Sequence, residues 1–344
     1  MDALFGKTLS QLQDLAVSQG LKPFVGKQIA NWLYQQKITS IDEMTNLSLE
    51  ARQGLKEKYQ LGLMAHQKVD VSVDGTKKYL YHIKGHQYVE AAYIPDGDRA
   101  TLCVSSQVGC KMGCLFCMTG KQGFQYHLSA GEILNQFHSL PEVKNITNIV
   151  YMGMGEPLDN LDSVLDSLEI LTSSWGYGMS SKRITLSTIG IIPGMKKFLD
   201  TTGVHLAISI HSPYEEERKS LMPIQQVYPI ADIIELLKGY DWSGQRRLSF
   251  EYICFDGVND SEDHARALAR LLGGIKARVN LIHFHPIPDS PLTGSSRSRM
   301  ETFQTILKGK GYYTTIRKSR GEDIFAACGL LSTKEKLAQE SKDY

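Results

Sequence analysis

Three cysteines stand close together about a third of the way along the chain. Their spacing is Cys110-x3-Cys114-x2-Cys117, so one loop can wrap the three thiols around a single centre. A structural zinc site normally takes four protein ligands, whereas three thiolates on a [4Fe–4S] cluster leave one iron open to a small molecule. The spacing therefore favours an open cluster. A zinc site completed by Cys103 is the first alternative, and a single catalytic thiol, which would not need three neighbouring cysteines, is the second.

The composition is that of an ordinary globular protein. Of the 344 residues 42% are hydrophobic and 22% are charged, which excludes disorder, collagen and coiled coil as overall descriptions. The formal net charge is +1, so any nucleic-acid surface must be local. Apolar stretches are only strand-sized and residues 1–20 mix polar with apolar types, so we expect no membrane segment and a cytoplasmic location. Disulfides are rare there, which favours metal binding or thiolate chemistry for the cysteines.

Strand-sized apolar runs follow residue 98 in a regular rhythm. Six of them, mostly separated by stretches of helical periodicity, predict six βα units around a parallel sheet. Right-handed crossovers would wrap these units into an open, incomplete version of the (β/α)8 barrel, with catalytic groups at the C-terminal ends of the strands. The runs are 100–105, 146–152, 183–188, 204–210, 248–254 and 279–284.

Other patterns flank this core. Amphipathic helical patterns predict a small helical N-terminal domain over 1–64, and alternating polar and apolar residues predict a short connecting β element over 65–97. We expect the barrel core over 98–290 and a C-terminal extension over 291–344.

The cysteine loop, with Phe116 before its last cysteine, resembles that of the radical S-adenosylmethionine (SAM) superfamily. Further motifs follow one another as in the RlmN-type adenine-C2 methyltransferases of 23S ribosomal RNA and transfer RNA. They are Leu-Cys-Val-Ser-Ser-Gln-Val-Gly-Cys at 102–110, Met-Gly-Met-Gly-Glu-Pro at 152–157, Leu-Ser-Thr at 186–188, Ser-Ile-His-Ser-Pro at 209–213, Leu-Met-Pro-Ile at 221–224, Gly-Val-Asn-Asp at 257–260 and Asp-Ile-Phe-Ala-Ala-Cys-Gly at 323–329. The resemblance covers essentially the whole chain. It implies an α/β fold with a partial (β/α)6 radical SAM barrel, and one [4Fe–4S] cluster on Cys110, Cys114 and Cys117.

The resemblance also implies a substrate and a reaction course. The substrates are adenine 2503 of 23S ribosomal RNA, in the peptidyl-transferase centre, and adenine 37 of certain transfer RNAs. C2 of adenine has no nucleophilic lone pair, so a radical is required. In this family the residue at Cys328 takes a methyl group from a first SAM, a radical from a second SAM activates it, and the methylene adds to C2. Glu90 then accepts the C2 proton, and Cys103 releases the RNA by forming a Cys103–Cys328 disulfide.

Simpler explanations exist for each of these residues. Taken alone, Cys328 and Cys103 could be small buried hydrophobic residues, and Glu90 could be a solvated strand residue. Cys254 matches no functional position, and we expect it in the core.

Residues at the expected rim match the SAM contacts of the family. Gly155 permits close backbone approach, and Glu156 can accept hydrogen bonds from the SAM amino group. The further contacts are Ser187, Ser209, Ile210 and His211. His285 stands where many relatives have Asn before Pro, and it cannot reproduce the paired donor and acceptor of an amide. Standing alone, residues 155–157 could be only a turn that ends a strand.

A basic segment near Cys328 predicts an RNA-facing surface, although a solvated helix face gives the same pattern. It contains Arg297, Arg299, Lys308, Lys310, Arg317, Lys318 and Arg320, with Tyr312 and Tyr313 interleaved. The implied partners are 23S ribosomal RNA and transfer RNA, together with an electron donor such as flavodoxin or ferredoxin, and we expect a monomer.

Two rival functions share many of these features. One is the related adenine-C8 methyltransferase that confers resistance to ribosome-targeting antibiotics; Glu156-Pro157 and residues 318–321 favour the C2 enzyme instead. The other is a non-catalytic RNA-binding protein stabilised by zinc on Cys103 and the three clustered cysteines.

Overall fold

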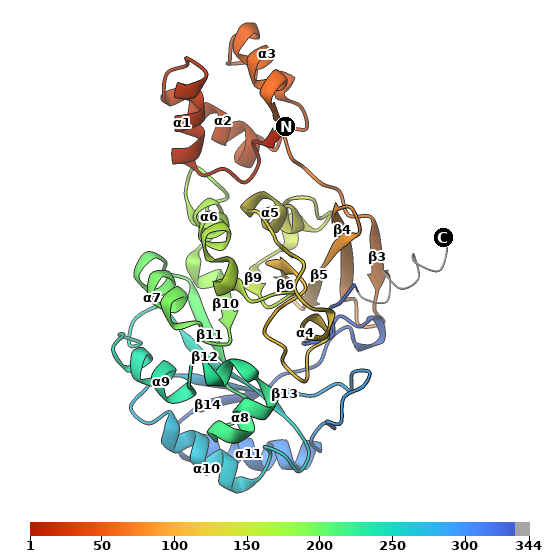
Figure 1. Cartoon of the computed structure of the whole chain (residues 1–344), viewed down its shortest axis with the longest axis vertical. Coiled ribbons are helices and arrows are strands. Elements are labelled where there is room, and N and C mark those ends of the chain that lie inside the picture. The colour runs from red at the N-terminus through yellow and green to blue at the C-terminus, as the bar shows by residue number, and fades with distance from the viewer. Residues whose placement is uncertain (334–344) are drawn as a thin grey trace.

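The computed structural model describes residues 1–333, and a ten-stranded sheet forms its centre (Figure 1). The strand order is β14-β13-β12-β11-β10-β9-β6-β5-β4-β3. From β6 to β14 all neighbours are parallel, whereas β3 to β6 pair as an antiparallel meander. The parallel strands are β6 (Arg99–Cys103), β9 (Asn148–Tyr151), β10 (Ile184–Thr188), β11 (His205–Ser209), β12 (Leu248–Cys254), β13 (Arg278–His283) and β14 (Tyr313–Ile316).

The first six parallel strands confirm the six predicted apolar runs, and β14 is a seventh strand that the sequence did not predict. Each strand presents two different faces. In β10, Ile184 and Leu186 are fully buried, while Thr185 and Ser187 between them are only half-buried. Apolar residues thus point towards the covering helices, and polar residues point into the interior of the open barrel.

Helices connect the parallel strands and cover the outside of the sheet (Figure 1). Their sequences carry clear start signals: Ser129 and Glu132 form a capping box at the first of the long helices. These helices are α4 (Met118–Gln122), α5 (Ala130–His138), α6 (Leu161–Thr172), α7 (Ile192–Thr201), α8 (Glu215–Leu221), α9 (Ile230–Lys238), α10 (Glu262–Leu271) and α11 (Arg297–Gly309). Short 3-10 turns lie at Ile41–Glu43, Val143–Asn145, Pro157–Asn160, Ser181–Arg183, Pro223–Gln226 and Glu322–Ile324. A small antiparallel pair, β7 (Gln107–Val108) and β8 (Tyr126–His127), brackets the cysteine loop.

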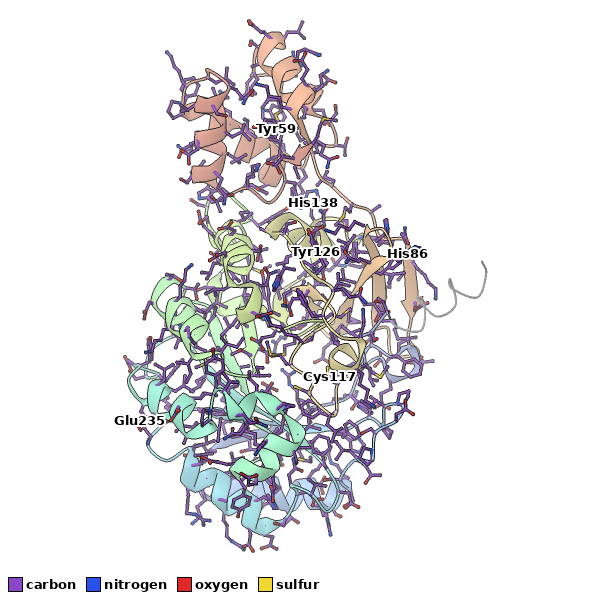
Figure 2. All side chains as sticks on the ribbon, viewed as in Figure 1. Tyr59, His86, Cys117, Tyr126, His138 and Glu235 are labelled. Atoms are coloured by element: carbon purple, nitrogen blue, oxygen red, sulfur yellow. The ribbon has the colours of Figure 1, made fainter. Side chains whose placement is uncertain are left out.

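The first sixty residues form the expected helical unit, which stands at one end of the molecule (Figure 1). It comprises α1 (Leu9–Ser18), α2 (Phe24–Ala30), a π-helical segment (Asn31–Gln36) and α3 (Leu49–Lys58), tied by the parallel pair β1 (Asp2–Ala3) and β2 (Tyr59–Gln60). The unit is anchored to α5, where the Phe5 ring lies 4.9 Å from that of His138, labelled in Figure 2 at the junction. Gly6 packs directly on the backbone of Gly131, a contact too close for any side chain.

The connecting element is built into the main sheet. Strands β3 (Lys68–Val71), β4 (Lys77–Lys84) and β5 (Gln87–Asp96) are antiparallel, as expected, and β5 pairs directly with β6. This segment therefore extends the barrel sheet beyond its first strand. Among residues 1–333, no helix has the length and apolar character needed to cross a membrane.

Candidate functional site

One cavity of about 460 Å³ gathers most of the predicted site residues. That volume is in the usual range for a cofactor or substrate pocket. It is lined by the C-terminal ends of the parallel strands, by the cysteine loop and by residues 317–329. The predicted residues that line it are Cys103, Cys110, Cys114, Cys117, Gly155, Glu156, Ser187, Ser209, His211, His285 and Cys328; Glu90 and Ile210 are outside its lining.

The three clustered cysteines lie on the loop that leads into α4, beside which Cys117 is labelled in Figure 2. Burial raises the pKa of the Cys110 thiol to about 12 and that of Cys114 well above its usual range. Thiols at such a site become ligands only when a metal favours the thiolate. In the part of the chain that the structure describes, no three or more His, Cys, Asp or Glu side chains are placed to hold a single metal ion. Three thiols facing one cavity fit a multi-iron cluster, in which each sulfur binds a different iron.

Cys103 and Cys328 are two further cysteines that line the same cavity, and we call them the outer sulfur pair. Cys103 ends β6 and packs against Ala92 and Ala326. Burial raises its pKa to about 12, and a thiolate at Cys328 would raise it further. Both are free cysteines; Cys328 is exposed as a residue, although its surroundings enclose the thiol enough to raise its pKa. The four-thiol zinc site that would include Cys103 is thus not supported, because this residue is associated with Cys328.

Arg317 places a positive charge near the thiol of Cys328. Burial raises the pKa of Cys328, and the charge of Arg317 opposes this increase. Arg317 follows β14, and its Nε lies 3.9 Å from Oε2 of the buried Glu251. The amide of Asn280 donates to Oε1 of this carboxylate over 2.7 Å. The sequence pointed to Arg317 only as one member of a basic segment, because β14 itself was not foreseen.

Glu90 lies on β5, outside the cavity lining. Its side chain is 2% exposed, and Oε1 lies 3.1 Å from Nζ of Lys78. The amide of Ser332 donates to Oε2 over 3.1 Å. Ala92 pairs with Cys103 in the sheet, so Glu90, two residues earlier, lies on the same face as Cys103. The explanation of Glu90 as a solvated strand residue is therefore wrong.

The segment that carries Cys328 is fastened to the turn between β3 and β4. Asp323 accepts hydrogen bonds from Ser72 Oγ over 2.6 Å and from the amide of Val73 over 3.1 Å. Asp74 accepts from the amide of Gly321 over 3.0 Å. Burial alone would raise the pKa of Asp74, but hydrogen bonds from Thr76, Gly321 and Ser72 lower it to about 2. Two carboxylates thus clamp the chain just before Cys328, and we call these contacts the hairpin clamp.

Glu156 is a buried carboxylate at the rim predicted for SAM. Burial raises its pKa to about 7, although hydrogen bonds from Thr188 Oγ1 at 2.6 Å and the Ile189 amide at 3.0 Å oppose this. Its neighbour Gly155 has φ +98°, and a Cβ there would lie 2.5 Å from the Cβ of Gln107. The motif at 155–157 therefore places an anchored carboxylate in the cavity wall, which is more than a simple turn requires.

The remaining rim residues differ in how they meet the cavity. His211 has φ +56°, and burial lowers its pKa to about 3, so the ring is neutral and its Nδ1 accepts from the amide of Ile253. Ser187 and Ser209 line the cavity, whereas Ile210 is fully buried in the core. His285 lines the cavity with Nε2 2.8 Å from Ser319 Oγ. Cys254 is fully buried, which confirms its expected place in the core.

The basic segment over 297–320 offers less free charge than its sequence indicates. Each of its four arginines has an acidic partner: Arg297 with Glu301, Arg299 with Asp256 and Asp260, Arg317 with Glu251, and Arg320 with Asp96. These partners come from distant parts of the chain, apart from Glu301, and only folding brings them together.

Family models match two parts of the chain. Residues 104–269 match the model of the radical SAM superfamily, and residues 3–61 match the N-terminal domain of ribosomal RNA large subunit methyltransferases.

Curated and solved proteins match over nearly the full length. A probable dual-specificity RNA methyltransferase RlmN of Bacteroides fragilis is 58% identical over 330 residues, which are 96% of each chain. The dual-specificity RNA methyltransferase RlmN of Marinobacter nauticus is 40% identical over 95% of this chain and 92% of its own. The crystal structure of a radical SAM methyltransferase from Sphaerobacter thermophilus superposes with a TM-score of 0.88 at 37% identity, covering 96% of this chain and 99% of that one.

Proposed function

Because the chain belongs to the RlmN family of radical SAM RNA methyltransferases, we propose that it methylates C2 of adenine 2503 in 23S ribosomal RNA and of adenine 37 in certain transfer RNAs. One observation carries this proposal: a single cavity holds three clustered thiols together with Cys103 and Cys328. A methyltransferase that acts on nitrogen or oxygen by displacement has no need for five sulfurs. A carbon without a lone pair does require radical chemistry, and two further thiols beside the cluster ligands suit a covalent methyl carrier and its release.

The residues that line this cavity fit the cluster and the SAM that the superfamily uses. We assign Cys110, Cys114 and Cys117 as the cluster ligands and Glu156 as an acceptor for the SAM amino group. When bound, the reduced cluster supplies the electron that cleaves SAM to a 5′-deoxyadenosyl radical. Ser187, Ser209, the Ile210–His211 backbone and His285 would complete the SAM contacts. Since the Ile210 side chain lies in the core, only its backbone could contribute.

The outer sulfur pair performs the transfer in this proposal. As a thiolate, Cys328 takes the methyl group of one SAM by displacement, and S-adenosylhomocysteine leaves. A second SAM would provide the 5′-deoxyadenosyl radical, which takes a hydrogen from this methyl and becomes 5′-deoxyadenosine, and the methylene radical then forms a bond to C2. The RNA radical so formed must give up its C2 proton and one electron, for which the cluster would be the acceptor. Cys103 then attacks the Cys328 sulfur, the carbon–sulfur bond breaks, the released carbon takes up a proton to become the methyl group, and a disulfide remains. Two SAM are consumed in each turnover, and an external thiol must reduce the disulfide.

Glu90 is the proposed acceptor of the C2 proton. It shares the sheet face of Cys103, and Lys78 balances its charge in a buried position. The amide of Ser332 occupies one carboxylate oxygen. Each carboxylate oxygen keeps a further lone pair with which Glu90 could accept the proton.

The remaining partners follow from the chemistry. The cluster needs a low-potential electron donor, for which flavodoxin or ferredoxin is suited. A monomer in the cytoplasm would meet both RNA substrates there.

The deciding experiment is an anaerobic reaction with SAM, a reductant and unmodified 23S ribosomal RNA. The RNA is digested, and the methylated nucleoside is identified by mass spectrometry against standards. The proposal expects 2-methyladenosine; 8-methyladenosine, or no methylated adenosine from a protein with about four irons per chain, would refute it.

Three cysteine variants test the assigned roles. Cys328→Ala should bind iron but transfer no methyl group, and Cys103→Ala should accumulate a covalent protein–RNA adduct. Cys254→Ala is the matched control, because it removes a cysteine that lies in the core away from the cavity, and it should turn over normally.

A further inference from the structure

Basic side chains gather at the end of the barrel opposite the cysteine loop. Arg99 and Arg278 begin β6 and β13, and Arg183 and Arg247 come immediately before β10 and β12. In a parallel sheet these positions share one edge, the N-terminal edge. They are about 84, 64 and 31 residues apart in the sequence, so only the fold unites them.

Three of these four arginines lie on the side of the sheet that faces the inside of the barrel. Arg99, Arg247 and Arg278 each stand four residues before a side chain that lines the cavity, and side chains four apart on a strand share a face. The pairs are Arg99 with Cys103, Arg247 with Glu251, and Arg278 with Ile282. Tyr313 has the same relation to Arg317 on β14. The carbonyl of Arg247 still accepts the ladder hydrogen bond from Leu206, so the strand register extends to this residue. Arg183 ends a short 3-10 turn, so its place at this edge follows only from its position immediately before β10.

The four arginines lie close to one another. Burial and the charges of Arg278, Arg99 and Arg183 together lower the pKa of Arg247. The guanidinium of Arg278 lies 4.9 Å from the ring centre of Tyr313, whose side chain is exposed. We call Arg99, Arg183, Arg247, Arg278 and Tyr313 the arginine mouth.

Charge in the arginine mouth is not neutralised by the protein. Within residues 1–333, no ion pair to Asp or Glu involves any of its four arginines, and all four are exposed. The arginines of the 297–320 segment, in contrast, are all paired. Of the four, Arg99 alone lines the cavity. Like charges held together are costly for the protein alone and become favourable with an anionic partner.

We propose that the arginine mouth binds phosphates of the RNA substrate, so that RNA docks at the N-terminal end of the barrel. Arg99 lines the same cavity as Cys328, so a nucleotide held at this mouth can extend its base inwards to the methyl carrier. The exposed ring of Tyr313 offers a stacking surface for a neighbouring base. This inference rests on the proposed function, because it requires that the substrate is RNA.

The expected effect follows from counterion release. Each phosphate contact to single-stranded RNA contributes about 0.7 to the slope of log K against log salt. At 0.1 M salt one contact is therefore worth about 5-fold in affinity, and three contacts about 100-fold. Removing three arginines should also reduce the salt slope by about 2.

The test compares two triple variants with the same change in net charge. The first is Arg183→Ala/Arg247→Ala/Arg278→Ala in the mouth. The control is Lys58→Ala/Lys196→Ala/Arg270→Ala, which removes three exposed cations of α3, α7 and α10 that lie outside both the mouth and the 297–320 segment and have no ion pair in the described chain. Binding of a fluorescent 23S ribosomal RNA fragment containing the target adenine is measured between 50 and 200 mM KCl without SAM. Thermal melting and iron content verify that both variants are folded.

The mouth variant should bind about 100-fold more weakly at 0.1 M salt, and the corresponding triple Lys variant should recover most of the affinity. Unchanged affinity and salt slope in the mouth variant, or a larger loss in the control, would overturn the inference. If the wild-type protein binds RNA through the mouth but forms no 2-methyladenosine, the proposed function is refuted, whereas the inference that the mouth binds RNA stands.

Discussion

Replacing Arg317 by methionine should slow the loading of Cys328 with a methyl group. Methionine has a similar length and no charge, so the cavity keeps its shape while the thiol loses the positive charge beside it. The thiolate is the nucleophile, and burial already raises the pKa of Cys328 above its usual value. Without Arg317 the pKa rises further, and a smaller fraction of the thiol is ionised at any pH below it.

The size of the effect follows from the geometry. An opposite charge close to an ionisable group shifts its pKa by about one to three. The Arg317 side chain is 39% exposed, so water screens part of this interaction and we take the lower limit, about one. A thiolate of higher pKa is intrinsically more nucleophilic, with a Brønsted coefficient of about 0.5, so half of the loss is recovered. Loading at pH 8 should therefore be about 3-fold slower.

The assay is the incorporation of labelled methyl from SAM into the protein in a single turnover without RNA. Between pH 7 and 9 both proteins should load faster as the pH rises. The pH profile of the variant should be shifted to higher pH by about one pH unit. Arg317→Lys should restore much of the rate, since it keeps a cation. Lys318→Met removes the neighbouring cation, for which the structure shows no contact with the thiol, and serves as the control.

An identical rate and an identical pH profile for Arg317→Met would refute this reasoning. Slower loading without a displaced profile would assign Arg317 a purely structural role. The double variant with Glu251→Gln separates the two, because it also removes the buried carboxylate that would otherwise lose its partner.

Three further predictions concern the SAM rim and the N-terminal unit. The pKa of Glu156 is about 7, so SAM affinity should rise about 10-fold between pH 6 and 8 as the carboxylate ionises, and calorimetry should find no such rise in Glu156→Gln. Gly155→Ala forces a Cβ against Gln107 at positive φ, and should weaken SAM binding and cost about 1–3 kcal/mol of stability in thermal melting. Tyr34→Phe removes a buried hydroxyl bonded to two backbone groups, and should lower the unfolding free energy of the N-terminal unit by about 1–3 kcal/mol.

The sequence predicted the strands of the barrel because their burial is strong and continuous. It did not predict β14, since Tyr313–Ile316 is short and contains two threonines. Thr314 is nonetheless buried, and Thr315 donates to Oδ1 of Asn280 on the neighbouring strand β13. Residues 313–316 therefore form a strand because the fold supplies partners for them, although their own sequence pattern is too weak to predict one.

Some residues of the site can likewise be recognised from the sequence alone, whereas others can be recognised only from the fold. The spacing of Cys110, Cys114 and Cys117 is local, so the amino-acid sequence alone is enough to recognise it. The ion pair of Glu90 with Lys78 depends on the register of two consecutive strands, and the pairing of Arg317 with Glu251 joins residues far apart in the sequence. A charge count over 297–320 could not detect that acidic residues neutralise its arginines. Four arginines, at 99, 183, 247 and 278, each stand four positions before a cavity-lining residue, but this spacing acquires a meaning only from the fold.

The hairpin clamp has a consequence for the order in which the enzyme matures. The ribosome makes β3 and β4 about 250 residues before Asp323, and domains generally fold from the N-terminus during synthesis. Cys328 can take its place only after the last part of the chain docks onto that waiting turn. A chain cut short before residue 328 would keep the cysteine loop and lack Cys328, the proposed methyl acceptor. Under the proposed function, such a chain would carry the cluster ligands and could not complete a turnover.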